Sequence, residues 1–186
     1  YEILIGLVGS EMCIRDSMRA AAMEPRIRRV VSWSVLPSIY GALMADKPAE
    51  IRAKLEHWLD ENNRDAILDL YAGLAEREPL FRWSIQHSNY AYGTSDVYEY
   101  LQKARAFTIE PVAERITQDV LLLSAREDLL VDFALYKQEI DLLKNTRSLE
   151  FAVPGRALNG QAHCNMGNTR FMLDLILNWI DRTLER

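Results

Sequence analysis

Two side chains far apart in the sequence have the types and positions needed for acid–base chemistry. Asp128 lies just after the apolar segment DVLLLSA at 119–125, and His163 lies in the loop after SLEFAV at 148–153. In a Ser-His-Asp mechanism, the carboxylate fixes the tautomer and orientation of the imidazole. The imidazole takes the proton of the nucleophile and later donates it to the leaving group. Asp128 and His163 are therefore candidates for a catalytic acid–base pair.

Both residues and their neighbours also have structural interpretations, which the sequence leaves open. Aspartate is common in turns, so Asp128 could simply cap a loop or helix, and Glu127 and Asp132 are rival carboxylates. His163 could be a hydrogen-bonded structural histidine. Cys164 directly follows the candidate base, and a cysteine next in sequence to its base rarely reaches it. We therefore interpret Cys164 as a small buried packing residue.

A second group of candidates is aromatic. The segment LFRWSIQHSNYAYG at 80–93 holds Trp83, His87, Tyr90 and Tyr92 with poor helical periodicity. Packing within a helical region is the simpler interpretation, and lining the apolar side of a substrate pocket is the alternative. We keep these side chains as candidate substrate-binding residues. His57, among charged residues of a predicted helix, is expected to be solvated.

A sheet must position the acid–base pair. Short, mostly apolar segments at 29–35, 119–125 and 148–153 are typical of buried parallel strands. Helical patterns alternate with these segments, which predicts a parallel sheet with right-handed crossovers. Ligands of such sheets bind beyond the carboxyl ends of the strands. Asp128 and His163 should therefore emerge at the same edge of the sheet.

The first two predicted strands are separated by a long helical block. About sixty residues are too many for a simple crossover. Helical spacing runs through the block, and Asp96 with Glu99 has the pattern of a capping box. We expect an all-helical cap at 46–110, inserted into an α/β core formed by 18–45 and 111–186.

Three segments of the chain resemble the C-terminal part of cap-bearing α/β-hydrolases: AAAMEPRIRRVVSWSV, PVAERITQDVLLLSAREDLLV and GQAHCNMGNTRFMLDLILNWI. The family includes the FrsA-like proteins, dihydroxypseudooxynicotine hydrolase and sequences described as acyl-peptidases or esterases. The resemblance implies a partial α/β-hydrolase fold, with three parallel strands, flanking helices and a helical cap, and without the N-terminal half of the sheet. It also implies hydrolysis of an ester, amide or activated C–C bond, with Asp128 orienting His163 and with no metal or cofactor. The order of carboxylate before histidine agrees with this.

The nucleophile of that family is missing from the sequence. It occupies a Gly-x-Ser-x-Gly turn that should fall several residues before Met18, and the chain contains no such pattern. The loop that supplies the oxyanion hole would precede it. We therefore expect a truncated, inactive form of a hydrolase. The alternatives are a non-catalytic or regulatory binding protein of the same fold, and a different α/β protein, such as a small-molecule transferase, in which Asp128 and His163 never meet.

Residues 1–17 resemble translated adapter DNA of the kind used in sequencing libraries. The transposon mosaic end gives Glu-Met-Cys-Ile-Arg-Asp in one frame, as at 11–16, and the adjoining bases give Leu-Val-Gly-Ser, as at 7–10. We set these residues aside from the fold, and a strand through EILIGLV at 2–8 is the alternative. Without such a strand, the segment at 29–35 would have an unpaired apolar edge, which favours aggregation or a homo-oligomer.

Composition limits the classes of function. The chain of 186 residues has a net charge of −5 and no block of like charges, which argues against nucleic-acid binding. No apolar run is long enough to span a membrane. Cys13 and Cys164 form neither a disulfide framework nor a metal cluster, which favours a reducing cytoplasm. A small-molecule substrate is the expected partner.

Overall fold

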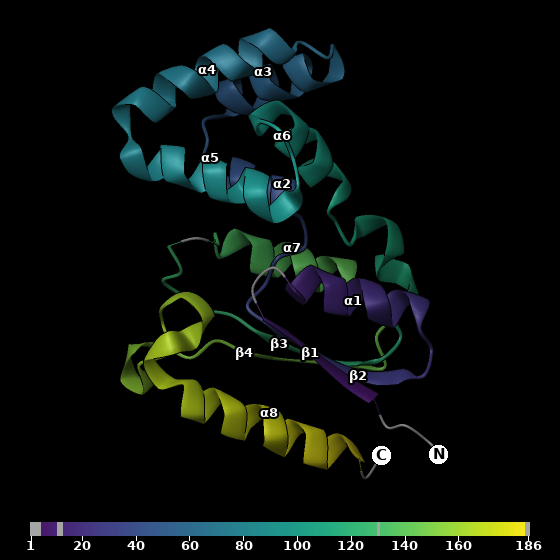
Figure 1. Ribbon diagram of the computed structural model, residues 1–186. Coiled ribbons are helices and arrows are strands. Elements are labelled where there is room, and N and C mark those ends of the chain that lie inside the picture. The colour runs from purple at the N-terminus through teal and green to yellow at the C-terminus, as the bar shows by residue number, and fades with distance from the viewer. Residues whose placement is uncertain (1–4, 11–12, 130, 185–186) are drawn as a thin grey trace. The chain divides into compact units, whose positions relative to one another are not determined.

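The chain is divided into two compact units in a computed structural model that describes residues 5–10, 13–129 and 131–184. One unit is formed by Tyr1–Ala42 with Thr108–Arg186, and the other by Leu43–Phe107. Figure 1 shows that the first unit holds the sheet and that the second is helical. The boundaries expected from the sequence, 46 and 110, lie within a few residues of this division.

The first unit is built on a parallel sheet with the strand order β1-β2-β3-β4. Its strands are β1 (Ile5–Ser10), β2 (Ile27–Trp33), β3 (Asp119–Leu123) and β4 (Ser148–Ala152). Helices α1 (Cys13–Met23) and α7 (Ala134–Leu142) cover one face, and α8 (Thr169–Leu184) covers the other (Figure 1). The three predicted strands are present with flanking helices, so the predicted parallel α/β architecture is confirmed.

A fourth strand, β1, lies in the segment that the sequence analysis set aside. β1 pairs in parallel with β2, from Ile5 opposite Ile27 to Ser10 opposite Trp33, and α1 begins at Cys13. Excluding residues 1–17 from the fold was therefore wrong, because their short apolar run pairs with the apolar strand β2. The edge of β2 that was expected to be unpaired is covered. The first residues of the alternative strand, 2–4, lie outside the described residues.

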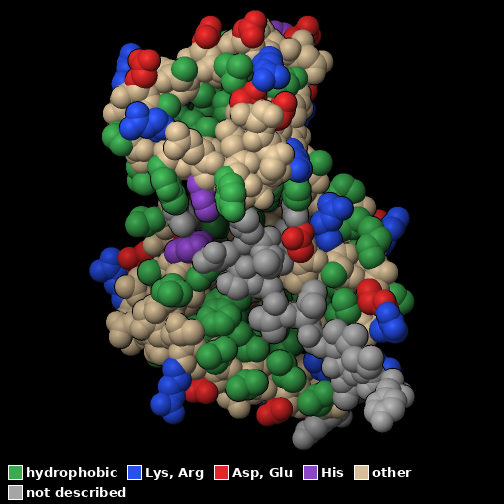
Figure 2. Space-filling view, viewed as in Figure 1, with side chains coloured by type: hydrophobic (Ala, Val, Ile, Leu, Met, Phe, Trp, Pro, Cys, Tyr) green, Lys and Arg blue, Asp and Glu red, His purple; other side chains and the backbone are tan. Residues whose placement is uncertain are grey.

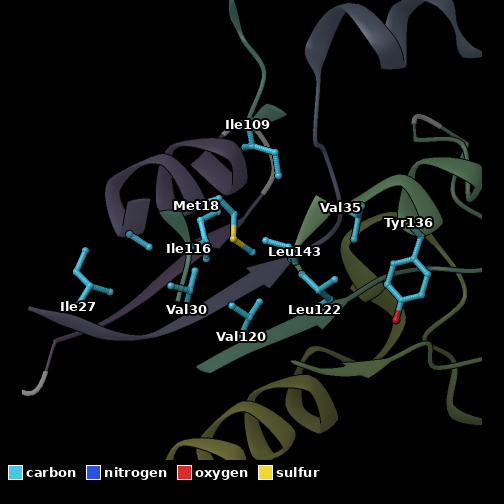
Figure 3. Close-up of a cluster of buried hydrophobic side chains, with 11 residues drawn as sticks. Met18, Ile27, Val30, Val35, Ile109, Ile116, Val120, Leu122, Tyr136 and Leu143 are labelled. Carbon is cyan, nitrogen blue, oxygen red and sulfur yellow. The ribbon is translucent and has the colours of Figure 1, made fainter. Parts of the chain in front are cut away.

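The core lies on both faces of the two central strands, because successive side chains of a strand point to opposite faces. Val30, Val120 and Leu122 pack with residues of α1 and α7 on one face (Figure 3). The alternate residues of the same strands pack against α8 on the other face, where Trp179 is fully buried. This double burial explains why β3 reads as a continuous apolar run.

The second unit consists of helices joined by short turns. They are α3 (Ala49–Asp60), α4 (Arg64–Arg77), α5 (Pro79–Tyr92) and α6 (Val97–Ala106), and α2 (Ile39–Ala45) crosses the boundary between the units. The capping box predicted at Asp96 and Glu99 is confirmed. The Glu99 N–H donates to Asp96 Oδ1 at 3.0 Å, and the Ser95 N–H donates to Glu99 Oε2 at 2.9 Å.

Charged side chains of both signs are interspersed over the face that Figure 2 shows. Among the described residues, no helix is both long enough and apolar enough to cross a membrane.

Arg147→Met is expected to lower the free energy of unfolding by about 1–2 kcal/mol at neutral pH. Arg147 forms an ion pair with Asp119, whose side chain is 1% exposed, so its loss leaves a buried charge with fewer partners. Because hydrogen bonding to Arg147 lowers the pKa of Asp119 in the folded state, this stabilisation is present above the usual pKa of aspartate and is lost as the pH falls. Urea unfolding measures it. Arg182→Met, which removes a surface pair with Glu150, is the control, and equal losses in both variants would contradict the expectation.

Candidate active site

The structure brings Asp128 and His163 into direct contact. Asp128 follows β3, and His163 begins η3 (His163–Asn168), a short 3-10 helix in the segment after β4. The imidazole Nδ1 lies 2.8 Å from Asp128 Oδ2 and 3.0 Å from Oδ1. The Asp128 side chain is 3% exposed and that of His163 is 27% exposed. A neutral imidazole in this bond carries its proton on Nδ1, which leaves Nε2 as an acceptor for a nucleophile's proton.

The rival carboxylates are engaged elsewhere. Glu127 accepts two hydrogen bonds from the Arg156 guanidinium, at 2.7 and 2.6 Å. Asp132 accepts the Ala134 N–H at 2.7 Å, at the start of α7. Of these three acids, Asp128 is therefore the one that contacts the imidazole. The alternative in which Asp128 and His163 never meet is wrong.

A buried asparagine that the sequence analysis missed ties the histidine loop to the sheet. The Asn165 side-chain amide donates to the carbonyl oxygens of Ser124, at 3.2 Å, and Gly160, at 2.6 Å. Its Oδ1 accepts from Trp33 Nε1 at 3.3 Å. Asn165 therefore links the ends of β2 and β3 to the loop after β4. Cys164, beside it, is buried.

Backbone conformation gives a reason for asparagine at this position. Cys164 has a φ of 50° and Asn165 a φ of 52°, both in the left-handed region. Asparagine is several-fold enriched there among residues with a side chain. The signal in the sequence was a His-Cys-Asn run next to glycine-containing turns, but the run alone does not show which carbonyls the amide reaches.

Gly167→Ala is expected to weaken the Asp128–His163 hydrogen bond. An added Cβ would overlap the carbonyl oxygen of Asn159, and because that atom belongs to the backbone, the histidine loop must shift. The measurement is the low-field proton resonance of a carboxylate-bonded imidazole N–H, which should broaden or disappear. Gly155→Ala is the matched control, because an added Cβ there meets nothing within 4 Å. An unchanged resonance in Gly167→Ala would contradict the expectation.

The aromatic candidates all belong to α5, in the helical unit. Trp83 stacks on His87 with ring centroids 5.1 Å apart, and both side chains are exposed. Tyr90 is 88% exposed, whereas Tyr92 packs against Tyr100, with centroids 5.2 Å apart. Tyr92 thus packs within the helical unit, which is the role that the sequence suggested for all four aromatic candidates. His57, on α3, is exposed.

The described residues contain no group of three or more histidine, cysteine, aspartate or glutamate side chains arranged to hold a metal ion. A histidine hydrogen-bonded to a buried carboxylate is the arrangement that general acid–base catalysis uses.

No protein-family model and no curated protein matches the chain, but solved structures do. The α/β hydrolase GrgF from Penicillium sp. sh18 has a TM-score of 0.61 and 16% identity, over 98% of this chain and 64% of that one. E-2-(acetamidomethylene)succinate hydrolase has a TM-score of 0.51 and 24% identity, over 95% and 66%. 2,6-Dihydroxy-pseudo-oxynicotine hydrolase has a TM-score of 0.54 and 18% identity, over 92% and 38%.

These matches establish the fold. The chain has part of an α/β-hydrolase fold, as the sequence resemblance implied, and it spans about two thirds or less of the length of each of these proteins.

Proposed function

We propose that Asp128 and His163 are the acid and base of a Ser-His-Asp hydrolase that acts on an ester, amide or activated C–C bond of a small organic molecule. The observation that carries the proposal is the hydrogen bond from Nδ1 to the buried carboxylate, at 2.8 Å. The two residues follow the neighbouring strands β3 and β4, at the sheet edge where ligands of parallel sheets bind. The mechanism uses the three side chains and the backbone N–H groups of an oxyanion hole, with no metal or cofactor.

In this proposal, the nucleophile belongs in the connection between β1 and α1. In α/β-hydrolases the serine sits in a sharp turn between a strand and a helix, and β1 ends at Ser10 while α1 begins at Cys13. The sequence across this connection is Gly9-Ser10-Glu11-Met12-Cys13. It begins with the glycine of Gly-x-Ser-x-Gly but has glutamate and cysteine at the third and fifth positions. Residues 11–12 lie outside the described residues.

We propose that the chain with this sequence is inactive, because no serine occupies the third position of the turn. Turnover of para-nitrophenyl acetate should equal that of His163→Ala, since an acyl-enzyme cannot form without a nucleophile. Robust turnover that His163→Ala abolishes would contradict the inactivity.

We also propose that residues 1–17 derive from adapter DNA and replace natural residues that carry the Gly-x-Ser-x-Gly turn. The support is the match between these residues and the adapter's reading frame. The experiment is to read the genomic codons upstream of Met18. Codons for Gly-x-Ser-x-Gly support the enzyme, and codons that encode residues 1–17 as printed contradict the adapter origin.

A non-catalytic binding protein of the same fold is the second candidate. The missing Gly-x-Ser-x-Gly pattern favours it, since the acid–base pair alone cannot form a covalent intermediate. The same genomic codons separate the two candidates, because glycine or aspartate at the third position of the turn favours the binding protein.

The proposed partner is a small-molecule substrate, in the cytoplasm and without nucleic acid or membrane. The net charge of −5 and the mixed charges in Figure 2 support the part of this proposal that excludes nucleic acid. A homo-oligomer is part of the proposal because β1 and β4 are the outer strands of the sheet. Size-exclusion chromatography tests it, and a monomer would contradict it.

A further inference from the structure

The inner stripe of α5 is unusual for a helix of a bundle. Phe81, Ser84, Ile85 and Ser88 follow the i, i+3, i+4, i+7 spacing of a core-facing stripe, but two of the four are serines. No residue of α5 is buried. Because a packed bundle needs large apolar side chains at these positions, the serines leave a hollow in the helical unit.

A pocket with about 440 Å³ of empty space, partly open to solvent, lies at this hollow. This figure includes space that is open to solvent, and the volume to compare with known cavities is about 110 Å³, which is smaller than a drug-sized site and limits the ligand to a small molecule. The lining residues come from the end of α2, the turn after it, α4, α5 and α6; all of them belong to Leu43–Phe107 and most are apolar. The lining includes Leu43, Tyr71, Phe81, Ile85, Val97 and Leu101. Tyr71 and Phe81 stack with ring centroids 5.5 Å apart, which gives the pocket an aromatic wall.

The polar groups of the lining include one cation. Lys47 lines the pocket, and its side chain is 26% exposed, whereas its neighbour Asp46, 3.0 Å from Nζ, is 82% exposed. The lining also holds the hydroxyls of Tyr71 and Tyr100 and of two serines, and the serine hydroxyls are already hydrogen-bonded within the unit. Ser84 Oγ donates to the Phe81 carbonyl at 2.7 Å, and Ser88 is hydrogen-bonded to Tyr100. Lys47 therefore supplies the positive charge of the lining, next to an apolar, aromatic wall, and its present partner is the well-exposed carboxylate of Asp46.

We propose that this pocket binds a small aromatic carboxylate, with the ring against Tyr71 and Phe81 and the carboxylate at Lys47. Aromatic rings gain from stacked or edge-on contacts with other rings. A carboxylate paired with a partly buried ammonium forms a charge-assisted hydrogen bond. The site involves only residues of Leu43–Phe107, so it does not depend on the function proposed for Asp128 and His163.

Titration of the whole chain with benzoate, and with benzamide as its neutral isostere, tests whether binding depends on the ligand's negative charge. Chemical shifts of α5 and α6 amides should saturate with benzoate, and Lys47→Met should weaken benzoate binding by about tenfold or more while changing benzamide binding little. Lys144→Met, which removes the same charge from an exposed residue of the other unit, should leave both affinities unchanged. No saturable shift with benzoate up to about 10 mM would overturn the proposal, and so would equal effects of the two lysine variants.

Filling the hollow tests the location. Ser84→Leu should abolish benzoate binding while keeping or raising the melting temperature, because it adds apolar volume where the bundle is under-packed. Gln86→Leu places the same side chain on the exposed face of α5 and should leave binding intact. Benzoate binding that survives in a folded Ser84→Leu chain would show that the ligand lies elsewhere and would overturn the proposal. If Ser84→Leu fails to fold, Ser84→Val gives the same comparison with less added volume.

Discussion

A chain that carries Glu11→Ser together with Cys13→Gly is expected to hydrolyse para-nitrophenyl acetate at least about 100-fold faster than the unaltered chain. The two changes turn Gly9–Cys13 into a Gly-x-Ser-x-Gly sequence between β1 and α1. In the proposed mechanism, the new serine is the nucleophile and His163 is its base. The expected gain is set far below the rate enhancement of a complete enzyme, because an oxyanion-hole donor that is lost costs about 100- to 1,000-fold in kcat.

The dependence of this gain on His163 and Asp128 is its control. In the doubly substituted chain, His163→Ala should return the rate to that of the unaltered chain, because the serine then has no base. Asp128→Asn should remove most of the gain, because the imidazole loses its orienting carboxylate. Gly155→Ala, in the same loop, should leave the rate unchanged. A rate that rises equally with and without His163 would contradict the proposed role of the pair.

Glu139→Gln is expected to stabilise the chain at alkaline pH. Glu139, on α7, is 0% exposed, and its Oε2 has no hydrogen-bond partner among the described residues. Its Oε1 lies 3.3 Å from Ser32 Oγ, whose single proton has a nearer acceptor in the Ser34 carbonyl, at 2.9 Å. Burial raises the pKa of Glu139 from 4.5 to about 8, and it outweighs the hydrogen bonds from the Ser32 hydroxyl and the Leu36 backbone N–H, which lower the pKa.

The sign and size of this effect follow from proton linkage. Because the folded state holds the proton of Glu139 more tightly, the contribution of this group to stability is full below pH 4.5 and is lost as the pH rises to about 8. A shift of this size corresponds to about 5 kcal/mol of folding free energy. Glutamine stays neutral, so the difference between Glu139→Gln and the unaltered chain should be small at about pH 5 and several kcal/mol at about pH 8.5.

Urea unfolding at both pH values measures this difference, and taking the difference between variants cancels the titration of all other groups. Glu56→Gln, an exposed change on α3, should show no such dependence on pH. A difference between Glu139→Gln and the unaltered chain that is the same at both pH values would contradict a buried, protonated Glu139.

The acid–base pair could be predicted from the sequence because each residue follows a strand segment. Asp128 and His163 each follow an apolar strand, and parallel strands bring their carboxyl ends to the same edge. The residues alone did not show which of Glu127, Asp128 and Asp132 contacts the imidazole. That choice depends on Arg156 and on the start of α7, which hold the two rivals away from the imidazole.

Other features could not be predicted because they arise from contacts distant in sequence. β1 was not expected in the fold because its apolar segment is short, and it forms a strand by pairing with β2. The sequence does not show that the side-chain amide of Asn165 donates to the carbonyl oxygens of Ser124 and Gly160. The hollow beside Ser84 depends on how α4 and α6 pack around α5, and the pattern of one helix does not show this.

Labelling by a fluorophosphonate probe tests the central claim most directly, because such a probe reacts with a serine that a neighbouring base has activated. In the chain with Glu11→Ser and Cys13→Gly, mass spectrometry should find the label at position 11. The labelling should be lost with His163→Ala and strongly reduced with Asp128→Asn. Equal labelling with and without His163, or no labelling at position 11 in the folded chain, would contradict the assignment of Asp128 and His163 as the acid and base of a serine hydrolase.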